Sequence, residues 1–305
     1  MPTRETVMSY PIIELHDAPT QFEQLGTKAK FWYRDQSGQS MLFKEGRPGT
    51  GENWAEKVCC EICRCLDIPH ADYNLAVWQD KKGVVTPSFV PEGARLVLGN
   101  ELLAKIIDDY GEGKRYQVRQ HTVRTVMAVA SVVALPLAWD APAVINDAAG
   151  VFVGYLMLDA LVGNQDRHDE NWGLVWLSDT GVFLAPTFDH ASSLGRNETD
   201  TVRCEMLGTR DKGRSVEAYV ARAKSALFAS PSSTKPLKTL DAYLEAAKIR
   251  QVAADYWKTK LATLKSDDFK AILADVPDAV ISAPAREFAR KMLEINTQRI
   301  LNTRQ

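Results

Sequence analysis

Long apolar runs are missing from this sequence. No stretch approaches the roughly eighteen uninterrupted apolar residues that a membrane-spanning helix needs. The N-terminal residues, MPTRETVMSYPIIELHD, also lack the charged and then apolar order of a secretory signal. We therefore expect a cytoplasmic protein that makes no contact with membranes.

Cysteine is scarce and clustered. The chain has five cysteines. Four of them fall in the segment 59–65, CCEICRC. An odd number of cysteines without a secretory signal argues against a disulfide framework. Cys59 and Cys63 could be imagined as two metal ligands on one helix, but the segment does not form the paired C-x-x-C elements of a zinc site. We expect these cysteines to pack as small hydrophobic residues.

Signatures of nucleic-acid binding are also missing. The sequence has no zinc-finger spacing and no Lys/Arg-rich cluster, and its formal net charge is -2. Its last part is more basic, because residues 203–305 carry 19 Lys and Arg against 12 Asp and Glu. This asymmetry would suit an acidic or nucleic-acid-bound partner, but it is also typical of an ordinary solvated helical surface, which we favour. We expect no direct contact with nucleic acid.

The composition that remains is that of a globular protein. Hydrophobic residues make up 45% of the chain and charged residues 25%, and 305 residues are enough for two core-bearing units. Internal repeats, heptads and low-complexity tracts are absent from the sequence. We expect one compact protein with two lobes.

A dense polar cluster lies in the segment 154–195. An apolar run leads there into the polar loop GNQDRHDEN, which is followed by two β-like runs and the triplet FDH. Phosphoryl transfer requires an Asp that orients the hydroxyl nucleophile, an Asn five residues later, and a second, metal-binding Asp beyond a hairpin. Asp166, Asn171 and Asp189 occur in that order.

The sequence DRHDEN, followed by TFDHASSLG, resembles the catalytic and metal loops of the HipA-like kinases. These are bacterial serine/threonine kinases with a fold distantly related to protein kinases and phosphoinositide kinases. The resemblance implies a bilobal α+β fold: an N-terminal lobe, residues 1–90, with a small antiparallel sheet and one helix, and a mostly helical C-terminal lobe, residues 91–305. It implies transfer of the γ-phosphoryl group of ATP, with Mg²⁺, to a Ser or Thr hydroxyl of a protein substrate. An antitoxin or another regulatory protein is a candidate partner.

The resemblance also implies roles for the loop residues. Asp166 would accept or orient the proton of the acceptor hydroxyl, and Asn171 and Asp189 would hold Mg²⁺ on the phosphates. Arg167 would stabilise charge or brace the loop, and His168 would pack beneath it. The order DRH stands in place of HRD, and FDH in place of DFG. The activation control of eukaryotic protein kinases is therefore not expected here.

A hairpin is predicted near the N-terminus. Two β-rich runs, Lys30–Arg34 and Met41–Lys44, flank the glycine-containing turn DQSG. In a kinase-like lobe, a strand lysine from such a hairpin pairs with the nucleotide phosphates. Lys44 is the candidate for this role.

The loop before this hairpin is the candidate for covering the phosphates, which kinase-like lobes do with backbone N–H groups. It contains Gly26, Thr27 and Lys28, and Lys28 is a second candidate for pairing with the phosphates. Thr27 either shapes the turn or, by analogy with the inhibitory autophosphorylation of HipA-like kinases, receives a regulatory phosphate.

A helix is predicted from a cap at Asn53 to about Leu66. Kinase-like sites need a carboxylate on this helix to pair with the strand lysine. Glu56 resembles the family's carboxylate by its distance from the sequence LDIP that follows the helix, and Glu61 is the alternative. Glu56 could also simply complete a capping box with Asn53.

The rest of the chain is predicted by pattern and order. Strands are expected at 73–79 and 83–90, and the second ends in Ser88, Phe89 and Val90, where backbone groups would meet the adenine edge. Residues 196–214 are expected to form a mobile loop like an activation segment. Helices are expected at 96–110, at 117–130, from a cap at Asn146 into the catalytic loop, at 215–228, at 237–264 with a break, at 266–276 and at 285–301.

Other functions remain open at this point. The same fold could phosphorylate a small molecule or a lipid headgroup, or it could be a non-catalytic module that binds nucleotides. The polar loop alone could be a capped surface loop. It could also be a metal-nuclease site with His168, Asp169 and Glu170 as ligands, although adjacent residues rarely point at one ion. The order of Lys44, Asp166, Asn171 and Asp189 favours a kinase.

Overall fold

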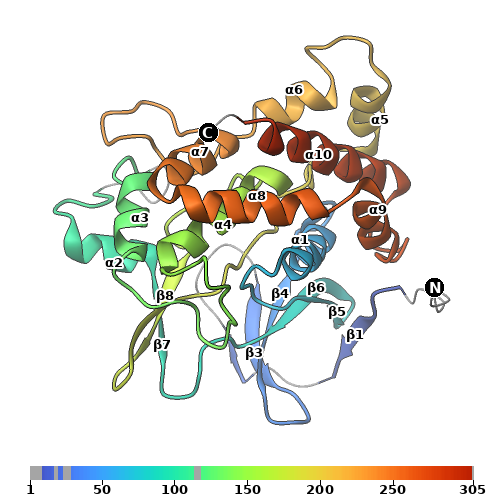
Figure 1. Ribbon diagram of the computed structural model, residues 1–305. Helices are drawn as coiled ribbons and strands as arrows, with labels where there is room; N and C mark the ends of the chain where they lie inside the picture. Colours follow the sequence, from blue (N-terminus) through green and yellow to red (C-terminus); the bar gives the residue numbers. More distant parts are fainter. Residues whose placement is uncertain (1–8, 17–19, 23–28, 113–117, 304–305) are drawn as a thin grey trace.

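The computed structural model describes residues 9–16, 20–22, 29–112 and 118–303. The candidate loop residues Gly26, Thr27 and Lys28 lie outside these ranges. The N-terminal part forms a six-stranded sheet, and the C-terminal part is mostly helical (Figure 1). The sheet has the order β1-β5-β6-β4-β3-β2 and is antiparallel except for the pairing of β1 with β5. Its strands are β1 (Ile12–Leu15), β2 (Gln21–Phe22), β3 (Lys30–Arg34), β4 (Ser40–Glu45), β5 (Asn74–Trp78) and β6 (Lys81–Pro87).

The hairpin of β3 and β4 confirms the prediction for this segment. Its turn is held by Asp35, whose Oδ1 accepts hydrogen bonds from the backbone N–H groups of Ser37 and Gln39, both at 2.9 Å. Residues that face each other across the two strands point to the same side of the sheet. One side carries aromatic core residues. The other carries two cross-strand pairs, Lys30 with Lys44 and Trp32 with Leu42.

Helix α1 (Glu52–Leu66) packs against strands β5 and β6 and against the helical part of the chain. Its N-cap residue is Gly51, so Asn53 lies inside the first turn and does not cap the helix as predicted. The alternative role of Glu56, completing a capping box with Asn53, therefore does not apply. Three of its four cysteines are buried in the core, as predicted, whereas Cys65 is exposed.

Helix α4 (Ala148–Val162) is the centre of the helical part, and all of its residues are buried. A helix that is apolar on all sides must be surrounded, and α3, α7, α8 and α10 pack around it. Its cap is Asp147, which accepts a hydrogen bond from the backbone N–H of Gly150 at 2.7 Å, and not the predicted Asn146. The other helices are α2 (Gly99–Ile106), α3 (Val123–Ala130), α5 (Asp200–Gly208), α6 (Val216–Ala221), α7 (Thr239–Ile249), α8 (Gln251–Thr263), α9 (Ser266–Ala274) and α10 (Ala283–Leu301).

A second, three-stranded sheet flanks the helices. It consists of β7 (Arg95–Leu98), β8 (Gly173–Leu177) and β9 (Gly181–Leu184) in that order, all antiparallel. The predicted helix from residue 96 is thus wrong over its first turn. Pairing of β7 with β8, which is far away in sequence, overrides the local helical pattern there.

The segment after residue 196 differs from the predicted loop, because α5 forms within it. Thr199 caps this helix by accepting a hydrogen bond from the N–H of Val202 at 3.3 Å. The guanidinium of Arg203, which is buried, donates to the carbonyl of Gly195 at 3.0 Å. The segment is therefore helical over Asp200–Gly208 and not a loop throughout. Among the helices of the described residues, none has the length and apolar character required to cross a membrane.

Candidate active site

A cavity of about 830 Å³ is lined by residues of the six-stranded sheet and of the helical part. Its volume falls in the range of small-molecule sites, roughly 300 to 1,000 Å³. Of the predicted site residues, Glu56 lies directly behind the cavity, where it contacts Lys44. The predicted residues that line the cavity are Lys44, Ser88, Phe89, Val90, Asp166, Asn171 and Asp189.

Lys44 contacts both α1 and the candidate metal loop, residues 187–195, from its place in the sheet. Its ammonium Nζ lies 3.0 Å from Asp189 Oδ1 and 3.4 Å from Glu56 Oε2. Burial disfavours a charged lysine, but the neighbouring Asp189 and Glu56 carboxylates outweigh that penalty and hold the pKa of Lys44 well above its usual value. Burial likewise opposes the charge on Glu56, but Lys44 and the His190 hydrogen bond lower its pKa below the usual value. The lysine is therefore a fixed positive charge at the cavity wall.

The metal loop is held in place by α1. The backbone N–H of His190 donates to Glu56 Oε1 at 2.6 Å, and His190 Nε2 lies 2.8 Å from Thr187 Oγ1. Asp189 has a φ of 58°, in the left-handed region that is uncommon for a residue other than glycine. The same carboxylate, Glu56, thus fixes both the lysine and the backbone that presents Asp189.

The candidate catalytic loop, residues 163–171, follows directly on the end of α4. Gly163 ends the helix with a φ of 66°, a conformation that glycine adopts without steric cost. Arg167, which is fully buried, donates to both carboxylate oxygens of Asp159, at 2.9 and 2.8 Å. Arg167 also donates to the carbonyl of Asn171 at 2.8 Å. Of the two predicted roles for Arg167, the geometry supports bracing of the loop.

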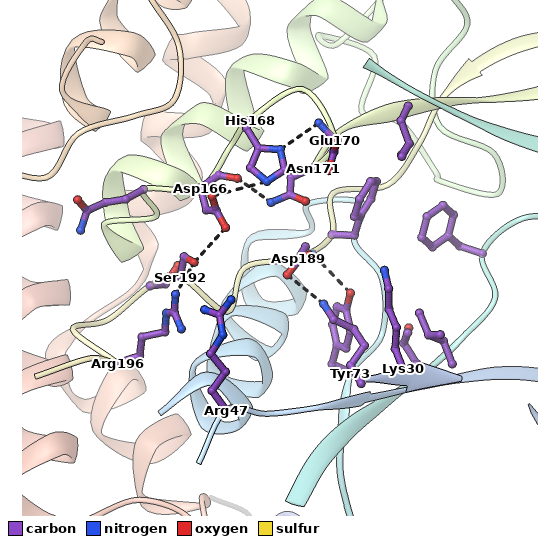
Figure 2. A pocket seen from close by; sticks show the side chains of 18 of the residues that line it. Lys30, Arg47, Tyr73, Asp166, His168, Glu170, Asn171, Asp189, Ser192 and Arg196 are labelled. Carbon is purple, nitrogen blue, oxygen red and sulfur yellow. Dashed lines mark hydrogen bonds and ion pairs between the residues drawn. The ribbon is translucent and has the colours of Figure 1, made fainter. Parts of the chain in front are cut away.

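Asp166 presents its carboxylate to the cavity (Figure 2). Its N–H donates to Asn164 Oδ1 at 3.1 Å, and its carbonyl accepts from Asn171 Nδ2 at 2.7 Å. His168 Nδ1 accepts from the N–H of Glu170 at 3.1 Å, so its other nitrogen, 3.7 Å from Asp166 Oδ1, carries the proton in the neutral ring. His168 lines the cavity beside Asp166 instead of packing only beneath the loop.

The metal-nuclease alternative is not supported by the side-chain positions. Asp169 is buried and its Oδ2 accepts a hydrogen bond from the hydroxyl of Tyr110 at 2.6 Å. Among the described residues no group of three or more His, Cys, Asp or Glu side chains is arranged to hold a metal. Mg²⁺ in phosphate sites is usually held by one or two carboxylates with phosphate oxygens and water, so it needs no such group.

Asn171 and Asp189 fit a Mg²⁺ ion of that kind. The Asn171 amide nitrogen donates to the carbonyl of Asp166, so the amide oxygen is the atom left to coordinate a cation. The Asp189 side chain is 33% exposed and both residues line the cavity. One carboxylate oxygen and one amide oxygen are hard ligands, which suit Mg²⁺.

The other end of the cavity suits a planar, mostly apolar group. The rings of Phe89 and Phe188 are stacked with centroids 5.6 Å apart. Ser88 and Val90 line the cavity as well, and the N–H of Val90 donates to Ser88 Oγ at 3.2 Å. The sequence interpretation missed several apolar residues that also line the cavity, among them Trp32, Leu42, Leu96 and Leu98.

The signal for Trp32 and Leu42 was present, because they alternate with the buried Phe31 and Phe43 of the hairpin. Leu96 and Leu98 could not be found in this way, since their segment was predicted as helix. Sequence reasoning also missed Arg47, Ser192 and Arg196, which line the cavity near Asp166.

Two solved structures to which this chain is similar share its overall fold. The Helicobacter pylori proinflammatory kinase CtkA is 19% identical with a TM-score of 0.69, over 97% of this chain and 100% of that chain. HipA of Shewanella oneidensis MR-1, solved with HipB and operator DNA as a toxin–antitoxin system, is 11% identical with a TM-score of 0.57, over 94% of this chain and 69% of that chain. No known protein-family profile and no curated protein sequence matches the chain. At these identities the likeness shows the fold alone.

Proposed function

We propose that this chain, which has the distant HipA-like, protein-kinase-like fold, is a cytoplasmic kinase that transfers the γ-phosphoryl group of ATP to a Ser or Thr hydroxyl. One observation carries the proposal. The buried ion pair of Lys44 with Glu56 and Asp189 shares a cavity with Asp166 and Asn171. Phosphoryl transfer needs these groups in one place.

One set of residues would bind the nucleotide and its metal ion. Lys44 would pair with phosphate oxygens of ATP, and the apolar residues around Phe89 would receive the adenine. Mg²⁺, held by Asn171 and Asp189, would neutralise charge on the phosphates. The positive charge of Lys44 is secured by its carboxylate partners, so it is present before the nucleotide binds.

Asp166 would act on the acceptor. Its carboxylate is 49% exposed, and its main chain is fixed on both sides by Asn164 and Asn171. An acceptor hydroxyl that donates to this carboxylate would be oriented toward the γ-phosphorus and would lose its proton to it. We place the N-terminal lobe at residues 1–90 and the C-terminal lobe at 91–305, with Ser88, Phe89 and Val90 at their junction.

A regulatory protein is included in the proposal as a candidate partner. It is supported by the structural neighbour HipA, which was solved bound to HipB. We expect the acceptor to be a protein, and small-molecule or lipid acceptors are the alternatives that the assay must separate.

Two substitutions test the assignment of roles. Asp166→Asn should leave the Kd for Mg·ATP nearly unchanged and lower phosphotransfer by about 10²-fold or more, since proton acceptance is lost and nucleotide contacts are kept. Asp189→Ala should instead weaken Mg²⁺-dependent binding of ATP. Asp179→Asn, in the exposed turn between β8 and β9, is the matched control and should change neither quantity.

Calorimetric titration with Mg·ATP and a transfer assay with γ-labelled ATP measure both effects. An Asp166→Asn variant with near-normal turnover would remove Asp166 from its role. An unchanged Mg·ATP affinity in Asp189→Ala would contradict the metal assignment.

A further inference from the structure

A chain of polar contacts joins the start of α1 to Asp166. Asp166 Oδ2 accepts a hydrogen bond from the hydroxyl of Ser192 at 3.2 Å, and Ser192 Oγ accepts one from Arg196 Nη2 at 2.9 Å. Figure 2 shows these two contacts as consecutive dashed lines at the side of the cavity near Arg47. The other guanidinium nitrogen of Arg196, Nη1, forms an ion pair with Glu52 Oε1.

The chemistry gives this chain of contacts one direction. A guanidinium can only donate, so the hydrogen bond from Arg196 occupies a lone pair of Ser192 Oγ. The hydroxyl proton of Ser192 is then directed to Asp166 Oδ2. Asp166 Oδ1 lies 3.7 Å from Nε2 of His168, beyond hydrogen-bond distance, and can accept from a further donor. The acceptor hydroxyl is the donor that phosphoryl transfer requires.

Burial shows which end of this chain of contacts, the relay from Glu52 through Arg196 and Ser192 to Asp166, is held most firmly. The Glu52 side chain is only 2% exposed and that of Arg196 11%, whereas the Asp166 side chain is 49% exposed. The backbone N–H of Gly51 also donates to the carbonyl of Arg196 at 2.9 Å. The buried end of this chain of contacts is therefore at α1, and it restrains the half-exposed carboxylate of Asp166.

The position of Glu52 on α1 adds a second reason. Glu52 and Glu56 are four residues apart and lie on the same face of the helix. Glu56 holds Lys44 and the metal loop, while Glu52 holds Arg196. One helix turn thus contacts both the nucleotide side and the acceptor side of the cavity.

We propose that Ser192, Arg196 and Glu52 are positioning residues, which hold the Asp166 carboxylate in the orientation that receives the acceptor hydroxyl. This inference rests on the proposed function. It assigns to α1 a second carboxylate whose role differs from that of Glu56. Loss of Glu52 impairs the acceptor side, and loss of Glu56 impairs the nucleotide side.

The test measures kcat, the KM for ATP and the Kd for Mg·ATP in single variants. Ser192→Ala and Arg196→Gln each lower kcat by about ten-fold to one-hundred-fold, the effect of losing a hydrogen bond to a charged group, and leave the Kd unchanged. Glu52→Gln behaves in the same way. Glu61→Gln is the matched control, because Glu61 lies on the same helix and pairs instead with Lys57 and Arg64. It keeps the kcat of the unmutated chain.

Two further variants separate positioning from a merely structural role. They do not involve Glu52, so they remain informative if Glu52→Gln fails to fold. Ser192→Thr keeps the hydroxyl and restores most of the kcat that Ser192→Ala loses. In an Asp166→Asn background, Ser192→Ala has no further effect on residual transfer, since the group it positions is gone.

The outcomes are distinct. If Ser192→Ala lowers transfer by the same factor in the unmutated and in the Asp166→Asn background, the relay is overturned and the proposed function stands. The same holds if Ser192→Ala raises the Kd for Mg·ATP instead of lowering kcat. No transfer by the unmutated chain with any acceptor overturns the proposed function and the relay with it. Epistasis with Asp166 together with rescue by Ser192→Thr establishes the relay.

Discussion

Replacing Asp159 of α4 by asparagine should be among the costliest single changes next to the candidate catalytic loop. Asp159 accepts two hydrogen bonds from Arg167, at 2.9 and 2.8 Å, and a third from Asn164 Nδ2 at 2.8 Å. The two paired side chains are 3% and 0% exposed. Asparagine has nearly the same shape as aspartate but carries no charge, so it leaves the buried guanidinium of Arg167 without a counter-charge. Breaking such a buried pair typically costs about 3–5 kcal/mol, a large share of the roughly 5–15 kcal/mol that stabilises a domain.

Thermal and urea unfolding measure this cost. A loss of about 3–5 kcal/mol corresponds to a Tm lower by about 6 °C or more in a chain of this size. Glu245→Gln is the control, because Glu245 forms an ion pair of similar length, 2.6 Å, with Lys248 on the exposed surface. That change should cost less than about 1 kcal/mol.

A variant with Arg167→Met as well as Asp159→Asn sharpens the test. Removing the stranded charge should recover part of the stability lost in Asp159→Asn. An Asp159→Asn protein as stable as Glu245→Gln would refute the reasoning that this buried pair braces the loop.

Two more predictions concern buried groups outside the cavity. With Cys59 and Cys63 as packing residues, the protein should fold under reducing conditions without bound metal. One zinc per chain, lost when both are replaced by alanine, would contradict this. His121 is buried, and its Nε2 accepts a hydrogen bond from Trp172 Nε1 at 2.9 Å. Burial lowers the pKa of His121 to about 4, below the ordinary 6.5, so protonation favours the unfolded state. Stability should therefore fall as pH decreases from about 6.5 to 4, and urea titrations of His121→Gln should show a weaker dependence over that range.

The local parts of the fold could be predicted because short-range patterns determine them. The hairpin of β3 and β4 follows from alternating residues around a turn that Asp35 stabilises. The break between α7 and α8 was also predicted. Asp166, Asn171 and Asp189, which were selected by their spacing in the sequence, line the same cavity. Their roles are still predictions.

The parts that depend on distant contacts could not be predicted. Leu96 and Leu98 belong to a strand only because β8, more than seventy residues later, pairs with it. Glu52 and Arg196 are 144 positions apart, and no spacing rule connects them. Helix α5, in a segment predicted as a loop, is likewise tied to the rest of the fold by a buried hydrogen bond from Arg203 to the carbonyl of Gly195. In each case a tertiary contact decides what the local sequence leaves open.

Transfer of labelled phosphate is the most direct test of the central claim. The unmutated protein, Asp166→Asn and the control Asp179→Asn are incubated with γ-labelled ATP and Mg²⁺, alone and with cell lysate, and labelled species are identified by mass spectrometry. The account predicts label on Ser or Thr residues of protein with the unmutated chain and Asp179→Asn, and its loss with Asp166→Asn or without Mg²⁺. Label confined to a lipid or small molecule, equal labelling by Asp166→Asn, or no labelled species would contradict it.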